Sequence, residues 1–309
     1  MVESPPSPPS RLRGRLGLAL GATLLALAAG EVALRIALPL PRLSAVFAPV
    51  DDPDLLYEPV PGARVRFERS GLQRGGEPAL VTIGDDGTRA MPPGEAGCAT
   101  LWLAGDSYVF GWGVSDDQTW AWGLQERLSE PLGCRPTILN LGVGGYHMAQ
   151  IEARLRRRLE RTTAPSLVLV HAAANDGIPD INWASPVGIP RWATERLHLL
   201  NVINLIAVTR QYAALEGQPG AEDRLGERLA SLTTMLAERS LPLWMVWQPD
   251  VPPAARLRAH PRRGETDLQP CNPGTAMHLN EDDDHYNAAG HGCIVDLLAP
   301  ELAAVLGAR

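Results

Sequence analysis

The sequence predicts an α/β fold with a central parallel sheet and helices on both faces, and two observations favour it. From Cys98 onward, short apolar runs alternate with segments whose apolar residues recur at helical spacing, a rhythm typical of parallel strands joined by helices. Small or polar residues also follow three of the apolar runs, at the strand ends where open α/β sheets bind ligands. We expect this domain to cover residues 98–309.

Strands and helices are expected to alternate along that domain. Short, bounded apolar runs predict strands at 99–104, 137–141, 166–171 and 243–247. Apolar residues at three- and four-residue spacing predict helices near 119–128, 147–161, 222–239 and 288–306. Two stretches interrupt the pattern: 177–206, expected to be an irregular excursion above the sheet, and 249–274, expected to be a long functional or mobile loop.

Two regions are expected before this domain, behind a short tail. Residues 1–15 are rich in proline, serine and arginine, which predicts a disordered basic N-terminus. Residues 41–97 contain prolines that exclude a long helix, and β-type runs at 64–67 and 79–83 predict a small β-rich region without catalytic groups. Between them, 16–40 is predicted to be a membrane anchor or a signal peptide.

The case for 16–40 rests on charge placement. Three arginines precede an uncharged run, Leu16–Gly30, and apolar residues continue past Glu31 to Leu40. Basic residues before an apolar segment keep the N-terminus in the cytoplasm and place the remainder outside. A cleaved signal peptide, with a possible site at Ala26-Leu27-Ala28, fits the shorter run. An uncleaved anchor fits the longer one, and both alternatives put the main domain in the periplasm or exterior.

Composition excludes several classes of function. The 28 basic and 35 acidic residues give a net charge of −7, which provides no electrostatic basis for binding nucleic acid. The chain has no lysine, so Schiff-base chemistry, a pyridoxal-phosphate lysine and a P-loop lysine are excluded.

Residues suited to nucleophilic catalysis occur at the predicted strand ends. Ser107, Gly145 and Asn175 each follow a different strand, and parallel strands would bring them to one edge of the sheet. Asp282 stands three residues before His285, close enough for a carboxylate to orient an imidazole. This predicts Ser107 as nucleophile, His285 as general base and Asp282 as orienting carboxylate. The backbone N–H groups of Ser107 and Gly145 and the Asn175 amide would form an oxyanion hole.

These residues resemble the four sequence blocks of the SGNH (GDSL-type) hydrolases, in order. The blocks are Gly105-Asp106-Ser107, Asn140-Leu141-Gly142-Val143-Gly144-Gly145, Ala174-Asn175-Asp176 and Asp282-Asp283-Asp284-His285. The leading apolar segment resembles the membrane-tethered bacterial branch. The resemblance implies a flavodoxin-like three-layer α/β/α sandwich and acyl-ester hydrolysis or acyl transfer without a metal or other cofactor.

Three features of the blocks bear on the site. Tyr108 stands where the family usually has leucine, and Ala173 where it has glycine, so that a methyl group would narrow the oxyanion site. The spacing from Asn140 selects Gly145 in the second block, with Gly144 and Gly142 as alternatives.

Each block alone has an ordinary structural explanation. Gly-Asp-Ser and Asn-Asp-Gly are common turns, and an acidic run is usually a solvated loop or occasionally a calcium site. The late histidines match no compact zinc pattern. The conjunction of four blocks in order is what favours the hydrolase.

Cysteine placement predicts one disulfide. Cys98 and Cys134 each precede one of the first two strands, which would be neighbours in a flavodoxin-like sheet. We expect them to pair at the edge opposite the active site, leaving Cys271 and Cys293 as a second possible pair; four free buried thiols are the alternative.

The sequence therefore predicts an extracytoplasmic serine esterase or acyl hydrolase held at the bacterial membrane, or secreted after cleavage. Its expected partners are the membrane and an acyl-ester substrate, such as a lipid or an acylated glycan. One alternative keeps the same residues in an O-acetyltransferase or deacetylase of cell-surface polysaccharide. The other is a non-catalytic carbohydrate-binding or scaffold protein on the same fold, against which the complete set of catalytic residue types argues.

Overall fold

A five-stranded parallel sheet forms the centre of the molecule in the computed structural model, which describes residues 10–37, 43–67, 78–185, 187–215, 218–259, 263–272, 274–280 and 283–307. The strand order is β6-β5-β7-β8-β9, the order of a flavodoxin-like sheet. Its strands are β5 (Thr100–Ala104), β6 (Thr137–Asn140), β7 (Leu167–Ala172), β8 (Leu243–Trp247) and β9 (Gly264–Asp267). The first four match the predicted strands to within a residue at most boundaries.

Strand β9 corrects the prediction that 249–274 is a loop. Its sequence, Gly-Glu-Thr-Asp, has no apolar run because β9 is an edge strand that pairs only with β8. The same stretch also contains helix α9 (Pro253–Arg256) and the 3₁₀ turn η3 (Gln269–Cys271).

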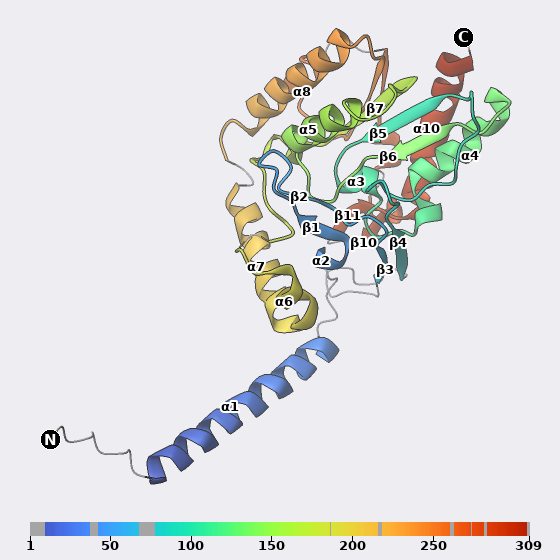
Figure 1. The fold of residues 1–309 in the computed structure, drawn as a ribbon. Helices are drawn as coiled ribbons and strands as arrows, with labels where there is room; N and C mark the ends of the chain where they lie inside the picture. Colours follow the sequence, from blue (N-terminus) through green and yellow to red (C-terminus); the bar gives the residue numbers. More distant parts are fainter. Residues whose placement is uncertain are drawn as a thin grey trace.

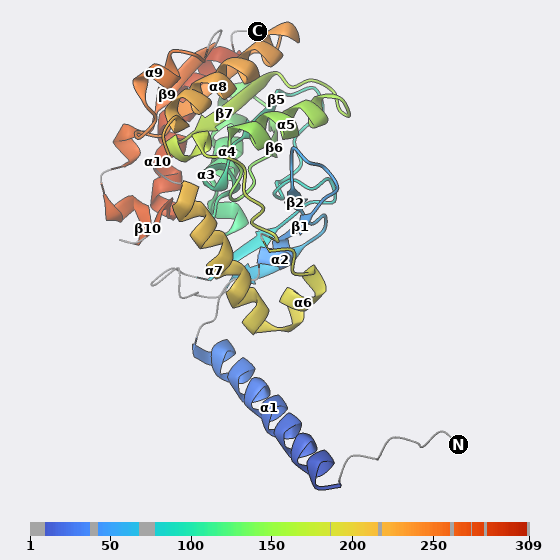
Figure 2. The same ribbon diagram turned by 90° about the vertical axis from the view of Figure 1, so that its left-hand side faces the viewer.

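Helices cover both faces of the sheet (Figures 1 and 2). Alternate residues of its strands contact helices on opposite faces. Trp102 and Val168 point to the face covered by α5 (Met148–Leu159) and α8 (Ala221–Glu238). Leu101 and Leu169 point to the other face, covered by α4 (Trp120–Leu132) and α10 (Ala288–Gly307). Both faces are buried, which explains why the strands are continuously apolar. The fold is the expected three-layer α/β/α sandwich.

Short elements follow the carboxyl ends of the strands. Helix α3 (Ser107–Phe110) follows β5, and the 3₁₀ turn η2 (Ala174–Gly177) follows β7. After β9 the chain forms η4 (Thr275–Met277) and a hairpin of β10 (His278–Asn280) and β11 (Asp283–Tyr286), then enters α10. These elements bring three distant segments of sequence to one edge of the sheet.

The region before the sheet is a long helix followed by small β elements. Helix α1 spans Ser10–Ala37, so residues 10–15 are helical and were wrongly included in the disordered tail; proline is confined to residues before Ser10 in this part of the chain. Residues 1–9 lie outside the described residues. The short helix α2 (Leu43–Val46) leads to two antiparallel pairs, β1 (Phe47–Pro49) with β2 (Tyr57–Pro59) and β3 (Arg64–Phe67) with β4 (Ala79–Thr82). Another 3₁₀ turn, η1 (Asp116–Gln118), lies against β4.

Two described helices are long and apolar enough to cross a membrane. Most of α1 projects from the rest of the molecule, as both ribbon views show. Within its candidate span of residues 14–37, most of the large apolar side chains are exposed. Helix α10 passes the same test of length and composition, but it packs on α4 and the sheet as a core helix. Of the two, only α1 has a candidate span that is not buried within the described part of the chain.

The stretch 177–206 is more regular than the sequence predicted. It contains α6 (Arg191–Arg196) and the start of α7 (His198–Leu215). The interpretation as an irregular excursion was wrong because α7 is apolar on several sides and so lacks the one-sided pattern by which a surface helix is recognised.

Two disulfides close loops at opposite ends of the sheet. Cys98 and Cys134 are bonded, with Cα atoms 5.9 Å apart, just before β5 and β6. Cys271 and Cys293 are bonded with Cα atoms 5.6 Å apart and connect η3 to α10.

Candidate active site

Ser107 is the first residue of α3, directly beyond the carboxyl end of β5. The buried Asp106 carboxylate accepts a hydrogen bond from the Tyr108 N–H at 3.0 Å and so caps this short helix. Gly105 allows the tight turn, because a Cβ there would lie 2.3 Å from Val109 Cγ2. Strand, turn and cap together hold the serine hydroxyl above the edge of the sheet.

His285 lies on β11 and reaches the serine. Its Nε2 is 2.7 Å from Ser107 Oγ, and its Nδ1 is 2.6 Å from Asp283 Oδ1. The same Asp283 oxygen accepts the backbone N–H of His285 at 3.1 Å. The imidazole therefore has a hydroxyl on one nitrogen and a carboxylate on the other, the arrangement in which a histidine can take a proton from a serine.

The carboxylate beside His285 belongs to Asp283, two residues before it. Asp282, expected in this position, lies outside the described residues. The expectation of a three-residue spacing assumed a tight turn, whereas 283–286 form a strand. Alternate residues of a strand share a face, which places Asp283 and His285 side by side.

Opposing effects set the electrostatics of this pair. Burial acts to lower the pKa of His285, but the hydrogen bond and charge of Asp283 outweigh it, so the pKa is raised above its ordinary value of 6.5. Burial acts to raise the pKa of Asp283, and the hydrogen bond and charge of His285 overcome it and lower that pKa. The geometry favours an ionised carboxylate next to a basic imidazole.

A cavity of about 620 Å³ opens beside Ser107 and His285 and is lined by Gly145 and Asn175. Gly145 has φ +79°, and a Cβ there would lie 2.5 Å from the Trp183 ring. Gly144 also lines the cavity, but its carbonyl accepts a hydrogen bond from the Tyr57 hydroxyl. A Cβ on Gly142 would meet the backbone of α3 instead. Among the three glycines, Gly145 has the backbone conformation that demands glycine within the cavity.

Tyr108, the second residue of α3, also lines the cavity and contacts the catalytic histidine candidate. Its ring stacks on His285 with centroids 5.0 Å apart, and burial together with the nearby Asp284 carboxylate raises the pKa of its hydroxyl. Asp250, which sequence reasoning missed, also lines the cavity and accepts the Ala174 N–H at 3.3 Å. Nothing in the sequence around Asp250 marks it, because it follows an apolar strand as an ordinary turn residue would.

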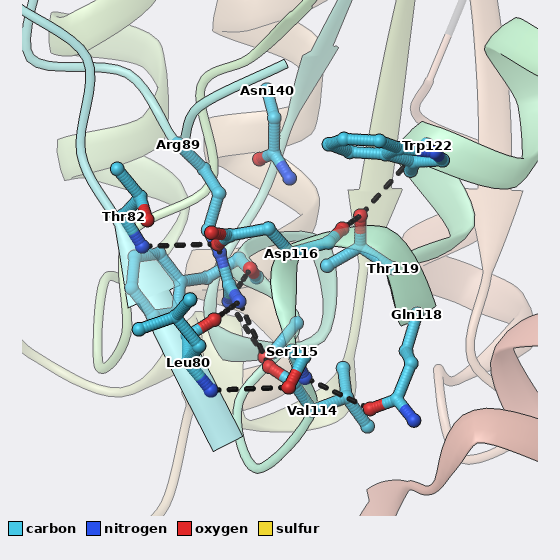
Figure 3. A network of polar contacts seen from close by, with 12 residues as sticks. Leu80, Thr82, Arg89, Val114, Ser115, Asp116, Gln118, Thr119, Trp122 and Asn140 are labelled. Carbon is cyan, nitrogen blue, oxygen red and sulfur yellow. Dashed lines mark hydrogen bonds and ion pairs between the residues drawn. The ribbon is translucent and has the colours of Figure 1, made fainter. Parts of the chain in front are cut away.

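Arg89 binds the C-terminal end of α3 and the segment that follows it; Figure 3 shows it among the polar groups around Val114 and Asp116. Its side chain is wholly buried and donates to the carbonyls of Phe110, Gly111 and Val114 at 2.7–2.8 Å and to Asp116 at 2.9 Å. The small β region, which sequence reasoning left without a catalytic role, thus supplies the group that binds the C-terminal end of the helix carrying Ser107.

One group of potential metal ligands is present among the described residues, and it coincides with this site. Asp283, Asp284 and His285 have ligand atoms within 4.8 Å of one another. Both ring nitrogens of His285 already have partners in Ser107 and Asp283. The imidazole therefore has no free nitrogen to offer an ion, and we assign no metal here.

Comparison with known proteins gives a family match over most of the sheet domain. A model of the GDSL-like lipase/acylhydrolase family matches residues 103–292. No curated protein matches the chain.

Several solved structures are similar at low identity. The psychrotrophic esterase EstA from Pseudoalteromonas sp. is 15% identical with a TM-score of 0.47, over 67% of this chain and 98% of that one. TesA is 19% identical with a TM-score of 0.46, over 67% and 99%. Axe2, an acetylxylan esterase from Geobacillus stearothermophilus, is 14% identical with a TM-score of 0.42, over 66% and 94%.

Proposed function

The chain belongs to the GDSL-like lipase/acylhydrolase family, and from this premise we propose that it is an extracytoplasmic serine esterase that cleaves acyl esters. The observation that carries the proposal is the continuous contact from Ser107 Oγ through His285 to Asp283, with both distances at or below 2.7 Å. Asp283 takes the role that the sequence analysis assigned to Asp282.

In the proposed reaction, Ser107 Oγ attacks the ester carbonyl carbon as His285 Nε2 accepts the hydroxyl proton. The charge of Asp283 stabilises the imidazolium that forms, and its bond to Nδ1 holds the ring in the required tautomer. Collapse of the tetrahedral intermediate expels the alcohol, which takes the proton from His285. Water, deprotonated by His285, then attacks the acyl-enzyme in the same way, which releases the carboxylic acid and restores the Ser107 hydroxyl.

Three groups are proposed to stabilise the oxyanion of that intermediate: the N–H groups of Ser107 and Gly145 and the amide of Asn175. All three residues line the cavity that contains the Ser107 hydroxyl. Preorganised donors of this kind contribute most when they point to the place where charge develops.

The proposed location outside the cytoplasm rests on two features. Two disulfides are present, and structural disulfides persist mainly in oxidising compartments. The exposed apolar part of α1 follows three arginines in the first turns of the same helix, and such a charge pattern orients a membrane segment with its N-terminus inside. We propose that α1 is retained as an anchor, since its outer end makes specific contacts with α7 that a cleaved signal peptide would not need.

The test is hydrolysis of p-nitrophenyl esters from acetyl to octanoyl by the full chain in detergent, beside its Ser107→Ala variant. Activity and fluorophosphonate labelling that both disappear in the variant would establish the nucleophile. A folded chain that neither hydrolyses these esters nor reacts with the fluorophosphonate would overturn the esterase proposal. Adding a sugar alcohol as acceptor in the same assay distinguishes transfer from hydrolysis by the product.

A further inference from the structure

Exposed apolar side chains outside α1 are concentrated in one segment. Outside α1, seven large hydrophobic residues are exposed among the described residues, and six of them lie between 187 and 206. We call this set the α6–α7 apolar surface; its members are Val187, Trp192, Leu197, Leu199, Ile203 and Ile206. Soluble proteins rarely expose large apolar patches, so six such side chains in one short segment indicate a contact surface.

Helix α7 differs here from an ordinary surface helix. Its exposed positions Leu199, Ile203 and Ile206 follow i, i+4, i+7 spacing and form one stripe. No Asp, Glu, Lys or Arg occurs between 197 and 209. Helix α8 provides the contrast, because its exposed positions begin with the charged residues Glu222 and Asp223. From Leu199 to Ile206 the exposed face of α7 is apolar and uncharged, which is typical of a helix that packs against an apolar partner.

The C-terminal end of α1 forms hydrogen bonds with the first residues of α7. Glu31 accepts the backbone N–H groups of His198 at 2.6 Å and Leu199 at 3.0 Å, and so caps the N-terminus of α7. Arg35, one turn further along α1, pairs with Glu31 at 2.7 Å and donates to the Arg196 carbonyl. The two charges that interrupt the apolar run of α1 therefore serve to join it to α6 and α7.

This junction fixes how far the apolar surface lies from a membrane crossed by α1. Glu31 is six residues before Ala37, the last residue of α1, which is roughly 9 Å at 1.5 Å per residue. The first turn of α7 is thus level with the final turns of α1. In both ribbon views, α6, the start of α7 and α3 lie on the side of the sheet from which α1 extends, and the C-terminus lies on the far side (Figures 1 and 2).

We propose that the α6–α7 apolar surface docks on the lipid bilayer, in the leaflet at which α1 emerges. This inference rests on the part of the proposed function that retains α1 as a membrane anchor. Trp192 is 60% exposed, and tryptophan prefers the boundary between headgroups and acyl chains. Neighbouring Arg196 is also exposed, and an arginine at this depth can extend its guanidinium to the headgroups.

Docking would also place the catalytic cavity at the lipid surface. Leu205, Thr209 and Tyr212 of α7 line the cavity, while Leu199, Ile203 and Ile206 do not. One helix thus separates the cavity from the surface assigned to lipid. The arrangement suits an acyl ester that resides in the membrane.

The test uses the full chain in lipid nanodiscs of phosphatidylcholine and phosphatidylglycerol. An Ile203→Cys variant carries an environment-sensitive fluorophore, attached without reductant because the native cysteines are paired. Matched variants are Glu227→Cys on the exposed face of α8 and Leu24→Cys within α1. A nitroxide-bearing lipid is expected to quench the label at 203 several-fold more than the label at 227, and a water-soluble quencher to show the reverse order.

Each other outcome overturns the inference in a distinguishable way. If the lipid quencher acts on the label at position 24 but not on the label at position 203, α1 is an anchor and the α6–α7 apolar surface does not contact the bilayer. No lipid quenching at Leu24 shows that α1 is not an anchor, while ester hydrolysis tests the catalytic proposal separately. Protection at Ile203 from both quenchers, with two chains in each disc, assigns the surface to a second copy. A label on a Leu199→Cys variant tests a second position of the same surface. Near-ultraviolet circular dichroism of each labelled variant checks that the label leaves the fold intact.

Discussion

The Asp283 carboxylate lies 2.6 Å from Nδ1 of His285 on the same face of strand β11. The contact raises the pKa of the imidazole and fixes its tautomer, so it should control both the rate and the pH dependence of catalysis. Asp282 and Asp284 flank Asp283, which gives three adjacent carboxylates with different expected roles.

Asp283→Asn should lower kcat on an ester substrate by on the order of 10³–10⁴, because the imidazole loses the partner that orients it and stabilises its charge. Asp282→Asn is the matched variant and should retain activity near that of the parent chain. Steady-state kinetics on both variants decides the assignment. A large loss in Asp282→Asn with a mild effect in Asp283→Asn would return the role to Asp282.

The pH profile of kcat/KM should rise through the pKa of His285, because the base must be neutral to accept the Ser107 proton. That pKa is raised, so the midpoint of the acidic limb should lie above 6.5. Removing the negative charge in Asp283→Asn removes the main cause of the increase and should move the midpoint to lower pH. A midpoint unchanged by the substitution would show that another group sets the limb.

Gly145→Ala should reduce kcat by on the order of 10²–10³, because shifting the backbone N–H that alanine retains would have the effect of losing one oxyanion donor. Its φ of +79° disfavours alanine, and the added Cβ would displace Trp183 or the backbone. Gly144→Ala is the control, since a Cβ there meets its nearest atom at 3.4 Å, on Phe47. Equal activity in the two variants would argue that Gly145 supplies no donor.

Arg89→Met should destabilise the protein by about 3–5 kcal/mol, because it leaves Asp116 and several carbonyls without their buried donor. Denaturant unfolding measures this, and Arg127→Ala is the comparison. Arg127 pairs with Asp296 on the surface, and such exposed pairs contribute at most about 1 kcal/mol. Similar losses in the two variants would contradict the role given to Arg89.

Sequence patterns predicted the buried strands and the helices that cover them, because both faces of β5, β7 and β8 require apolar residues. The patterns did not predict β9, because this edge strand is mostly exposed and its sequence therefore needs no run of apolar residues. Ser107, Gly145 and Asn175, which line one cavity, could be singled out because each follows a recognisable strand; their catalytic roles stay a prediction. The carboxylate was harder, since spacing alone cannot distinguish a turn from a strand at 282–285. Arg89 and Asp250 act through tertiary contacts that leave no local signal.

The two disulfides should differ in their effect on catalysis. The Cys98–Cys134 bond closes a 36-residue separation at the amino ends of β5 and β6, away from Ser107. Its replacement by two serines should cost about 4 kcal/mol of stability by the loop-entropy estimate, with kcat of the folded enzyme unchanged.

The Cys271–Cys293 bond closes a shorter loop that contains β10 and β11, and therefore both Asp283 and His285. Cys271→Ser with Cys293→Ser should cost about 3 kcal/mol and also lower kcat, because the hairpin that presents His285 to Ser107 is then held only by non-covalent contacts. Unfolding curves and kcat, measured at a temperature where both variants stay folded, separate the two effects. Equal kcat values would show that the contacts of the hairpin with α10 suffice to position His285.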